Sequence, residues 1–155
     1  MLRKQKRLGE ILLEKDLITP AQLKSALAEQ ARSKEFLGTI LVRRKLIKED
    51  ALLATLSEQF NIPVINLAYR YFDWKFVKDF SPTLILDYHC FPVTKDDWTV
   101  TIAITNPLDV WVLKKAEEEA RGLRLRLALT SEKDMQEAIQ RYRQCVQRHI
   151  SKLLD

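Results

Sequence analysis

Four residues at matched positions offer the chemistry of a binding surface: Gly9 and Gly38, and Gln30 and Gln59. A glycine lets another group approach the main chain closely, and a glutamine amide can hydrogen-bond to a flat polar partner. Only three glycines occur in the 155 residues, so their placement is informative. The pattern is open to two interpretations, a ligand surface and the packing of two equivalent helix pairs.

The four residues belong to a tandem duplication. Residues 7–30 and 36–59 align with a shift of 29 residues, ten of their 24 positions are identical, and residues 31–35 form the spacer. Most identities are apolar and helically spaced, which core packing explains, but packing alone does not require the glycines or glutamines. The identical pairs are Leu8/Leu37, Gly9/Gly38, Ile11/Ile40, Leu12/Leu41, Leu17/Leu46, Ile18/Ile47, Leu23/Leu52, Leu27/Leu56, Glu29/Glu58 and Gln30/Gln59.

Each copy is predicted to be a helix, a turn and a second helix. Thr19 is a capping residue, Pro20 suits the first helical position, and Gln22 stands three residues after the cap, so a helix begins there. The apolar spacing from residue 8 to 15 predicts a shorter helix before it. In the second copy Lys48 replaces the capping threonine.

The pattern changes near residue 62, which divides the chain into segments 1–61 and 62–155. The second segment predicts both strands and helices, with alternation of Trp98, Val100, Ile102 and Ile104 on one face of a strand. The expected fold is α+β, with an N-terminal tandem helix-hairpin repeat packed on a small C-terminal domain that has a mixed sheet and helices. The expected elements are a strand at 64–67, short helices within 69–80 and 82–88, a hairpin of 90–94 and 98–104, a helix from Asn106-Pro107 to Arg121 ending at Gly122, a strand at 123–127 and a helix from Ser131.

Composition narrows the class of protein. An apolar content of 46% can build a core, and no apolar run approaches the roughly 20 residues that cross a bilayer, so a cytoplasmic protein is expected. The net charge of +5 would attract anions, yet 21 acidic residues are interspersed, which argues against nucleic acid. A phosphorylated ligand, an acidic partner and solvated basic faces remain open. The excess lies at Arg3, Lys4, Lys6, Arg7, Arg43, Arg44 and Lys45.

The residues do not form a catalytic set. A phosphate-binding Gly-x-x-x-x-Gly-Lys-Ser/Thr loop is absent, so the chain is not expected to be an enzyme. His89 and His149 are 60 residues apart, and Cys90 and Cys145 lack metal-ligand spacing, so no metal or cofactor is expected. Aspartates 96–97 and glutamates 117–119 suit a turn and a helix exterior.

The tandem motif resembles the MshE N-terminal (MshEN) domain, the N-terminal domain of type II secretion and type IV pilus assembly ATPases. The segments Ile62-Pro63-Val64, Phe91-Pro92-Val93 and residues 103–109 are similar to further blocks of that family. The resemblance implies a cytoplasmic regulatory module that binds cyclic di-GMP, precedes an ATPase motor and reaches the inner membrane through its partners.

The resemblance also implies site residues in two half-sites, each taking one guanine. Phe36 stands where the second motif has an arginine, and Asp16 and Lys45 replace the glycine usual at the turn of each motif. Loss of one charge-assisted hydrogen bond would weaken binding by roughly 1.5 to 3 kcal/mol. The expected contacts are Arg7, Leu8, Gly9, Leu23, Leu27 and Gln30 in the first half-site, Leu37, Gly38, Leu52, Leu56 and Gln59 in the second, and Asn106, where many members have an aspartate.

A second hypothesis needs no nucleotide. In it the repeats serve only as a core, and the chain is a docking domain that recruits the secretion ATPase to an inner-membrane platform protein. A nucleic-acid adaptor is the weakest hypothesis, because it would need a continuous basic face.

Overall fold

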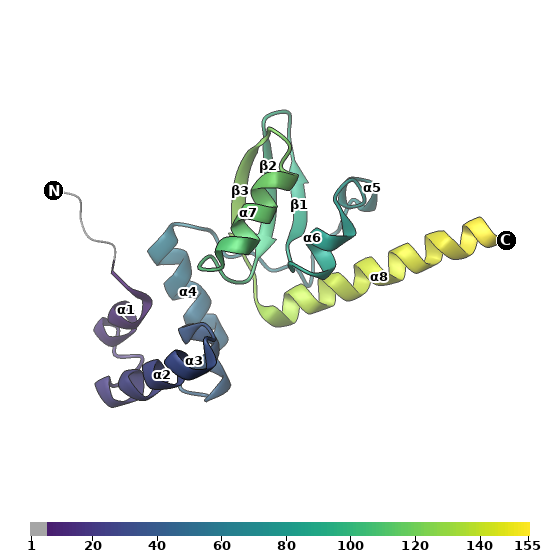
Figure 1. Ribbon diagram of the computed structural model, residues 1–155. Helices are drawn as coiled ribbons and strands as arrows, with labels where there is room; N and C mark the ends of the chain where they lie inside the picture. The colour runs from purple at the N-terminus through teal and green to yellow at the C-terminus, as the bar shows by residue number, and fades with distance from the viewer. Residues whose placement is uncertain (1–5) are drawn as a thin grey trace. The chain divides into compact units, whose positions relative to one another are not determined.

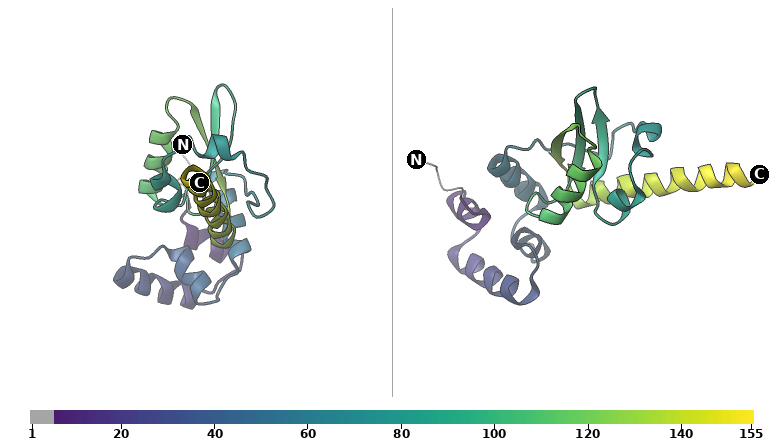
Figure 2. Two further views of the ribbon diagram at one scale, coloured as in Figure 1. Left: turned by 90° about the vertical axis from the view of Figure 1, so that its right-hand side faces the viewer. Right: turned by 45° about the horizontal axis from the view of Figure 1, so that its top comes forward.

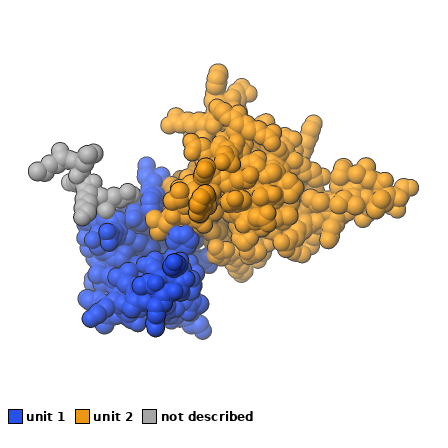
Figure 3. Space-filling view, in the orientation of Figure 1, with its two compact units in different colours: residues 1–61 blue, residues 62–155 orange. Residues whose placement is uncertain are grey.

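The computed structural model describes residues 6–155 and divides the chain into two compact units, residues 1–61 and 62–155 (Figure 3). Of the basic residues near the N-terminus, Arg3 and Lys4 lie outside the described residues. The first unit is helical, and the second combines helices with a sheet, so the α+β class is confirmed.

The first unit holds one helical hairpin per copy of the motif, as predicted (Figure 1). The first copy forms α1 (Leu8–Glu14) and α2 (Pro20–Ser33), and the second forms α3 (Leu37–Arg43) and α4 (Glu49–Phe60). The strongest helix contacts run between copies, α2 with α3 and α1 with α4. The core of the unit is therefore shared by both copies. It consists of Leu8, Leu12, Ile18, Ala26, Leu37, Ile40, Leu41, Ile47, Leu53 and Leu56.

The start of α2 confirms the predicted cap. The Thr19 hydroxyl accepts a hydrogen bond from the Gln22 amide nitrogen at 3.2 Å, and Gln22 Oε1 accepts one from the Thr19 amide nitrogen at 2.9 Å. These two bonds satisfy two helix N-terminal donors reciprocally. At the equivalent position of α4, Lys48 makes no such side-chain bond.

The turns inside the two hairpins have the same conformation. Asp16 and Lys45 have φ values of 54° and 58°, in the left-handed region. The next amide in each copy bonds back into its helix, Leu17 to Leu12 and Leu46 to Leu41, closing a Schellman turn. Glycine adopts this conformation without strain. Both turns therefore keep a glycine-type conformation with ordinary residues.

The second unit is built on a three-stranded mixed sheet with the order β1-β2-β3. Strand β1 (Phe91–Lys95) pairs antiparallel with β2 (Thr99–Ile104), and β2 pairs parallel with β3 (Arg124–Leu129). The parallel connection runs through α7 (Val110–Glu119). The predicted hairpin and mixed sheet are thus confirmed.

The strand expected at residues 64–67 is not formed. A single parallel bridge joins Val64 to Leu129, with Leu129 donating to the Pro63 carbonyl and Ile65 donating to the Leu129 carbonyl, both at 2.8 Å. The segment therefore pairs with β3 at only one residue and does not form a fourth strand of the sheet. A local pattern cannot reveal how far such pairing continues along a distant strand.

Trp98 is also placed differently from the prediction. Val100, Ile102 and Ile104 are fully buried along β2, whereas Trp98 is 80% exposed and precedes the strand. The reason is the turn before it, where Asp96 Oδ1 accepts hydrogen bonds from the amides of Trp98 and Thr99 at 2.8 Å.

Two short helices precede the sheet, α5 (Trp74–Val77) and α6 (Pro82–Leu86). The aromatic stripe predicted from residue 69 to 80 is only partly helical. Phe72 is buried ahead of α5 with its ring 4.7 Å from that of Phe91, while Tyr69 is 90% exposed. The side chains therefore pack as separate rings and not as one helix face.

Helix α7 begins later than predicted. Its cap is Asp109, whose carboxylate accepts hydrogen bonds from the amides of Trp111 and Val112, and not Asn106. Asn106 Oδ1 instead accepts from the Leu108 amide at 2.9 Å in a turn of its own. The helix also ends at Glu119, two residues before the predicted end, and is followed by Arg121 and Gly122 with φ values of 49° and 85°, in the left-handed region.

The last helix, α8 (Glu132–Leu154), begins as predicted after Ser131, whose hydroxyl accepts from the Asp134 amide at 3.0 Å. Its first half packs against the unit through a buried stripe that includes Met135, Ile139 and Tyr142. Its last turns extend beyond the other elements of this unit (Figure 2). None of the helices within residues 6–155 combines the length and the apolar content that crossing a bilayer requires.

Candidate functional site

The motif glycines lie where two helices come close together. A Cβ on Gly9 would stand 2.8 Å from Leu23 Cδ1, and a Cβ on Gly38 would stand 2.8 Å and 2.9 Å from the two methyl carbons of Leu52. Each glycine thus receives the first leucine of its own motif's second helix. Helix packing therefore gives both glycines a role, which corrects the expectation that packing alone does not require them.

The motif glutamines bind the main chain just before a motif. Gln30 Nε2 donates to the Glu35 carbonyl at 3.1 Å, one residue before the second motif, and Gln59 Nε2 donates to the Lys6 carbonyl at 3.0 Å, one residue before the first. Both side chains are half-buried. The terminal glutamine of each copy therefore hydrogen-bonds to the residue just before the other copy. We call this position, Lys6 or Glu35, the entrance of the copy that follows it.

Two ion pairs also join the copies in a reciprocal way. Lys15 of the first copy pairs with Glu58 of the second, and Arg44 of the second pairs with Glu29 of the first. A shift of 29 residues converts Lys15 to Arg44 and Glu29 to Glu58. The two copies are thus related by an approximate two-fold exchange of contacts.

Arg43 and Arg44 both form ion pairs with glutamates of the first unit. Arg43 also binds Glu29, and it lies 3.3 Å from Glu35. The hydrogen bond from Arg43 is the main cause that lowers the pKa of Glu29. This part of the basic excess therefore binds carboxylates of the same unit, which linear charge counting did not reveal.

Exposure separates the predicted site residues into two groups. Leu8, Leu37 and Leu56 are buried in the core of the first unit, so their side chains offer a ligand little surface. Leu27 is 45% exposed although its equivalent Leu56 is 3% exposed. The residues of the predicted site that reach the surface, fully or in part, are Arg7, Leu23, Leu27, Gln30, Leu52 and Gln59 in the first unit and Asn106 in the second.

Arg7 supplies an exposed cation at the start of the first motif. Its amide nitrogen donates to Glu10 Oε2 at 2.9 Å, and within residues 6–155 its guanidinium takes part in no ion pair. Phe36, at the matching position before α3, is 38% exposed. The two entrances therefore present different chemistry, a cation in one copy and an aromatic ring in the other.

Asn106 belongs to the second unit, where its side chain shapes the turn before α7. Burial, with a smaller contribution from Asp109, raises the pKa of the Cys90 thiol to about 12, which suits a packed side chain and not a nucleophile. Among the described residues, clusters of histidine, cysteine and carboxylate side chains suited to a metal ion do not occur.

The sequence of this chain matches a known domain family. The MshEN domain model matches residues 60–149, more than half of the chain, and the chain therefore belongs to the MshEN domain family. That match begins at the end of the tandem motifs.

Curated relatives include two type IV pilus assembly ATPases named PilB. The protein from Myxococcus xanthus is 30% identical over 137 residues and that from Thermus thermophilus is 46% identical over 111 residues. These matches cover 88% and 68% of this chain but only 24% and 12% of the two ATPases. The chain thus corresponds to a small part of each.

Solved structures share the fold. The structure of MshE with cdg superposes with a TM-score of 0.81 at 26% identity, covering 88% of this chain and 99% of that one. The N-terminal domain of XpsE superposes with a TM-score of 0.71 at 21% identity, covering 92% of this chain and 99% of that one, and this likeness shows the fold alone.

Proposed function

We propose that this chain is a regulatory module of a type II secretion or type IV pilus ATPase system and that its two motifs bind cyclic di-GMP. The observation that carries the proposal is the paired placement of Gln30 and Gln59 at the entrances of the two motifs, with Arg7 exposed beside one of them. The similarity to MshE with cdg over 88% of this chain supports it.

The chemistry of the exposed residues suits a guanine dinucleotide. Leu23 and Leu27 offer apolar surface on α2 to a purine face, and Arg7 can pair with a phosphate or a guanine edge. The amides of Gln30 and Gln59 would exchange their present carbonyl partners for guanine edges. Ligand binding would therefore remove the hydrogen bonds that hold both entrances. The resulting change in the first unit would be the signal that regulates the ATPase motor.

The second half-site should be the weaker one. Phe36 can stack on a purine but supplies no charge-assisted hydrogen bond. Restoring a cation through Phe36→Arg is expected to tighten cyclic di-GMP binding by about ten- to a hundredfold, the equivalent of roughly 1.5 to 3 kcal/mol.

Calorimetric titration of cyclic di-GMP into the chain tests the proposal. The parent and Phe36→Arg should give saturable heat, Arg7→Ala should bind more weakly, and Arg32→Ala, which removes an exposed arginine at the end of α2, should bind like the parent. No saturable heat at about 100 μM ligand for either the parent or Phe36→Arg would refute the proposal.

A docking domain without a nucleotide is the second candidate function. It is favoured by the internal partners of the motif, since leucines fill the space beside Gly9 and Gly38 and chain carbonyls hold Gln30 and Gln59. It predicts binding to the cytoplasmic region of an inner-membrane platform protein that survives Gln30→Ala and Gln59→Ala in a folded chain. The same variants should weaken cyclic di-GMP binding under the first proposal.

A further inference from the structure

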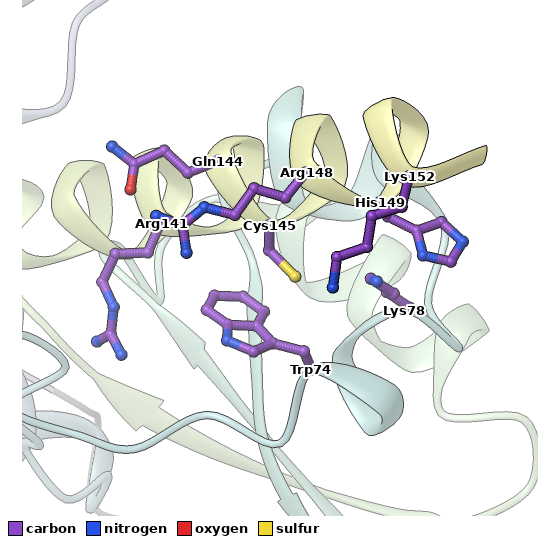
Figure 4. A pocket seen from close by; sticks show the side chains of 8 residues that line it. All are labelled: Trp74, Lys78, Arg141, Gln144, Cys145, Arg148, His149 and Lys152. Atoms are coloured by element: carbon purple, nitrogen blue, oxygen red, sulfur yellow. The ribbon is translucent and has the colours of Figure 1, made fainter. Parts of the chain in front are cut away.

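A basic groove with a volume of about 430 Å³ lies in the second unit between α5 and the C-terminal half of α8 (Figure 4). Its sides carry Lys78, Arg141, Arg148 and Lys152, and Trp74 faces α8 across it. Among the described residues, no carboxylate lines this groove. It is therefore a concentrated cationic surface in a chain whose other charges are mixed.

Arg141 has a structural role in the groove. Its Nη1 donates to the Arg70 carbonyl at 2.9 Å, and its guanidinium carbon lies 4.4 Å from the centre of the Phe72 ring. A guanidinium over an aromatic face is stabilised by cation–π attraction. The internal contacts of the second unit therefore account for Arg141, but not for the three remaining cations.

Lys78, Arg148 and Lys152 are exposed, and ion pairs of the residues from 6 to 155 include none of them. Arg148 and Lys152 are four residues apart on α8, a spacing at which like charges destabilise a helix. The helix dipole favours Lys152 in the last turn, but this effect fades within one turn and does not reach Lys78 on the opposite side. An anion in the groove would relieve the repulsion.

The cations are arranged in a row and do not converge on one point. From Arg141 to Lys152 the α8 side of the groove spans eleven residues, which is about 16 Å of helix. A single phosphate group would contact only a part of such a row. The arrangement fits an elongated ligand with several separated negative charges.

Exposed apolar side chains also occur on the last turns of α8. Ile150, Leu153 and Leu154 are 50%, 73% and 82% exposed and lie within four residues of one another, on a different side of the helix from Arg148 and Lys152. Phosphate groups and nucleic-acid backbones gain nothing by covering such side chains, whereas a protein segment can bury them. Charge and apolar surface on the same helix end therefore favour a protein over other polyanions.

We infer that the basic groove and the exposed end of α8 bind an acidic segment of a partner protein, with carboxylates facing Lys78, Arg148 and Lys152 and apolar side chains covering Leu153. This interaction is independent of the nucleotide proposed for the tandem motifs, because every residue in it belongs to the second unit.

Fluorescence anisotropy with a labelled 15-residue peptide of glutamate and leucine at helical spacing tests the inference on the full chain. Lys78→Glu with Arg148→Glu should weaken binding by at least about tenfold. The matched control is Lys75→Glu with Arg143→Glu, which makes the same charge change at exposed positions of α5 and α8 outside the groove lining. It should weaken binding by less than about threefold.

Further probes separate the alternatives. A peptide with glutamine in place of glutamate should bind poorly, and Leu153→Gln should weaken the acidic peptide while leaving binding of inorganic triphosphate unchanged. Equal losses in the two charge-reversal pairs would overturn the inference, as would tighter binding of triphosphate or of a 15-nucleotide DNA through the same residues. Circular dichroism melting curves verify that each variant is folded.

Discussion

The side chain of Leu23 occupies the space that a methyl group on Gly9 would need, with its Cδ1 2.8 Å from that position. The second copy repeats this relationship between Leu52 and Gly38 more tightly, because both leucine methyl carbons lie within 2.9 Å. The glycines of the motif therefore contribute to hairpin packing whatever else they bind.

Alanine substitution should distinguish the two glycines. Gly9→Ala meets one very close methyl group at the end of a flexible side chain, so the gain in helix propensity of up to about 1 kcal/mol should offset much of the clash. Gly38→Ala meets two, and Leu52 must change its rotamer, so we expect a net loss of about 1 to 2 kcal/mol. Urea unfolding measures both. A Gly38→Ala chain at least as stable as Gly9→Ala would contradict this account.

The absent cap of α4 offers a stabilising substitution. Lys48 stands at the cap position that Thr19 fills in the first copy, and its side chain makes no cap bond. Lys48→Thr should raise the free energy of unfolding by about 0.5 to 1 kcal/mol, and Thr19→Ala should lower it by about 1 kcal/mol. Lys48→Gln is the control for loss of charge. Equal stability of Lys48→Thr and Lys48→Gln would show that no cap had formed.

Asp96 makes the stability of the β1–β2 turn depend on pH. Hydrogen bonds from the Trp98 amide, and then from the Thr99 hydroxyl and amide, lower its pKa below the ordinary value of 3.8. A carboxyl whose pKa falls on folding stabilises the fold above its unfolded pKa, and this stabilisation is lost as pH falls through the folded pKa.

Replacing Asp96 by asparagine keeps an acceptor but removes the ionisation. We expect Asp96→Asn to be less stable than the parent above roughly pH 5, with the difference shrinking as the pH drops below 3.8. Thermal melts from pH 2.5 to 7 measure the difference. Asp97→Asn is the neighbouring control, because it removes one charge from the same turn but none of the hydrogen bonds to Asp96. A stability difference between the parent and Asp96→Asn that grows as the pH falls would contradict this prediction.

The two cysteines should react at different rates. Burial holds the pKa of Cys90 at about 12, so its reactive thiolate is scarce at pH 8, whereas Cys145 is half-buried on α8. Ellman's reagent should modify one thiol in the folded chain and two in guanidinium chloride. Cys145→Ser should abolish the reaction of the folded chain, and rapid labelling of that variant would show that Cys90 is accessible.

Local signals in the sequence predicted the elements well. Thr19 and Ser131 cap their helices as expected because a cap depends on residues within one turn. The start of α7 was misplaced because Asn106 and Asp109 are both capping residue types, and only the folded turn assigns Asn106 to the Leu108 amide. Trp98 was misplaced because the carboxylate of Asp96 ends the turn one residue later than the alternation suggested.

Long-range relationships were beyond the sequence pattern. The pairing of Lys15 with Glu58 joins residues 43 apart, and the pairing of Gln59 with Lys6 joins residues 53 apart. The duplication predicted equivalent positions but not that the copies exchange contacts. The residues proposed to hold cyclic di-GMP stay predictions, of which the structure locates Arg7 and Leu27 at the surface and Leu56 in the core.

The reciprocal contacts of Gln30 and Gln59, each with the residue just before the other copy, have the pattern of a two-fold dimer interface, here within one chain. In this view residues 31–35 are a tether that raises the effective concentration of one hairpin for the other. The two halves need not be identical in such an arrangement, and at matched positions Arg7 gives one a charged surface while Phe36 gives the other an aromatic surface.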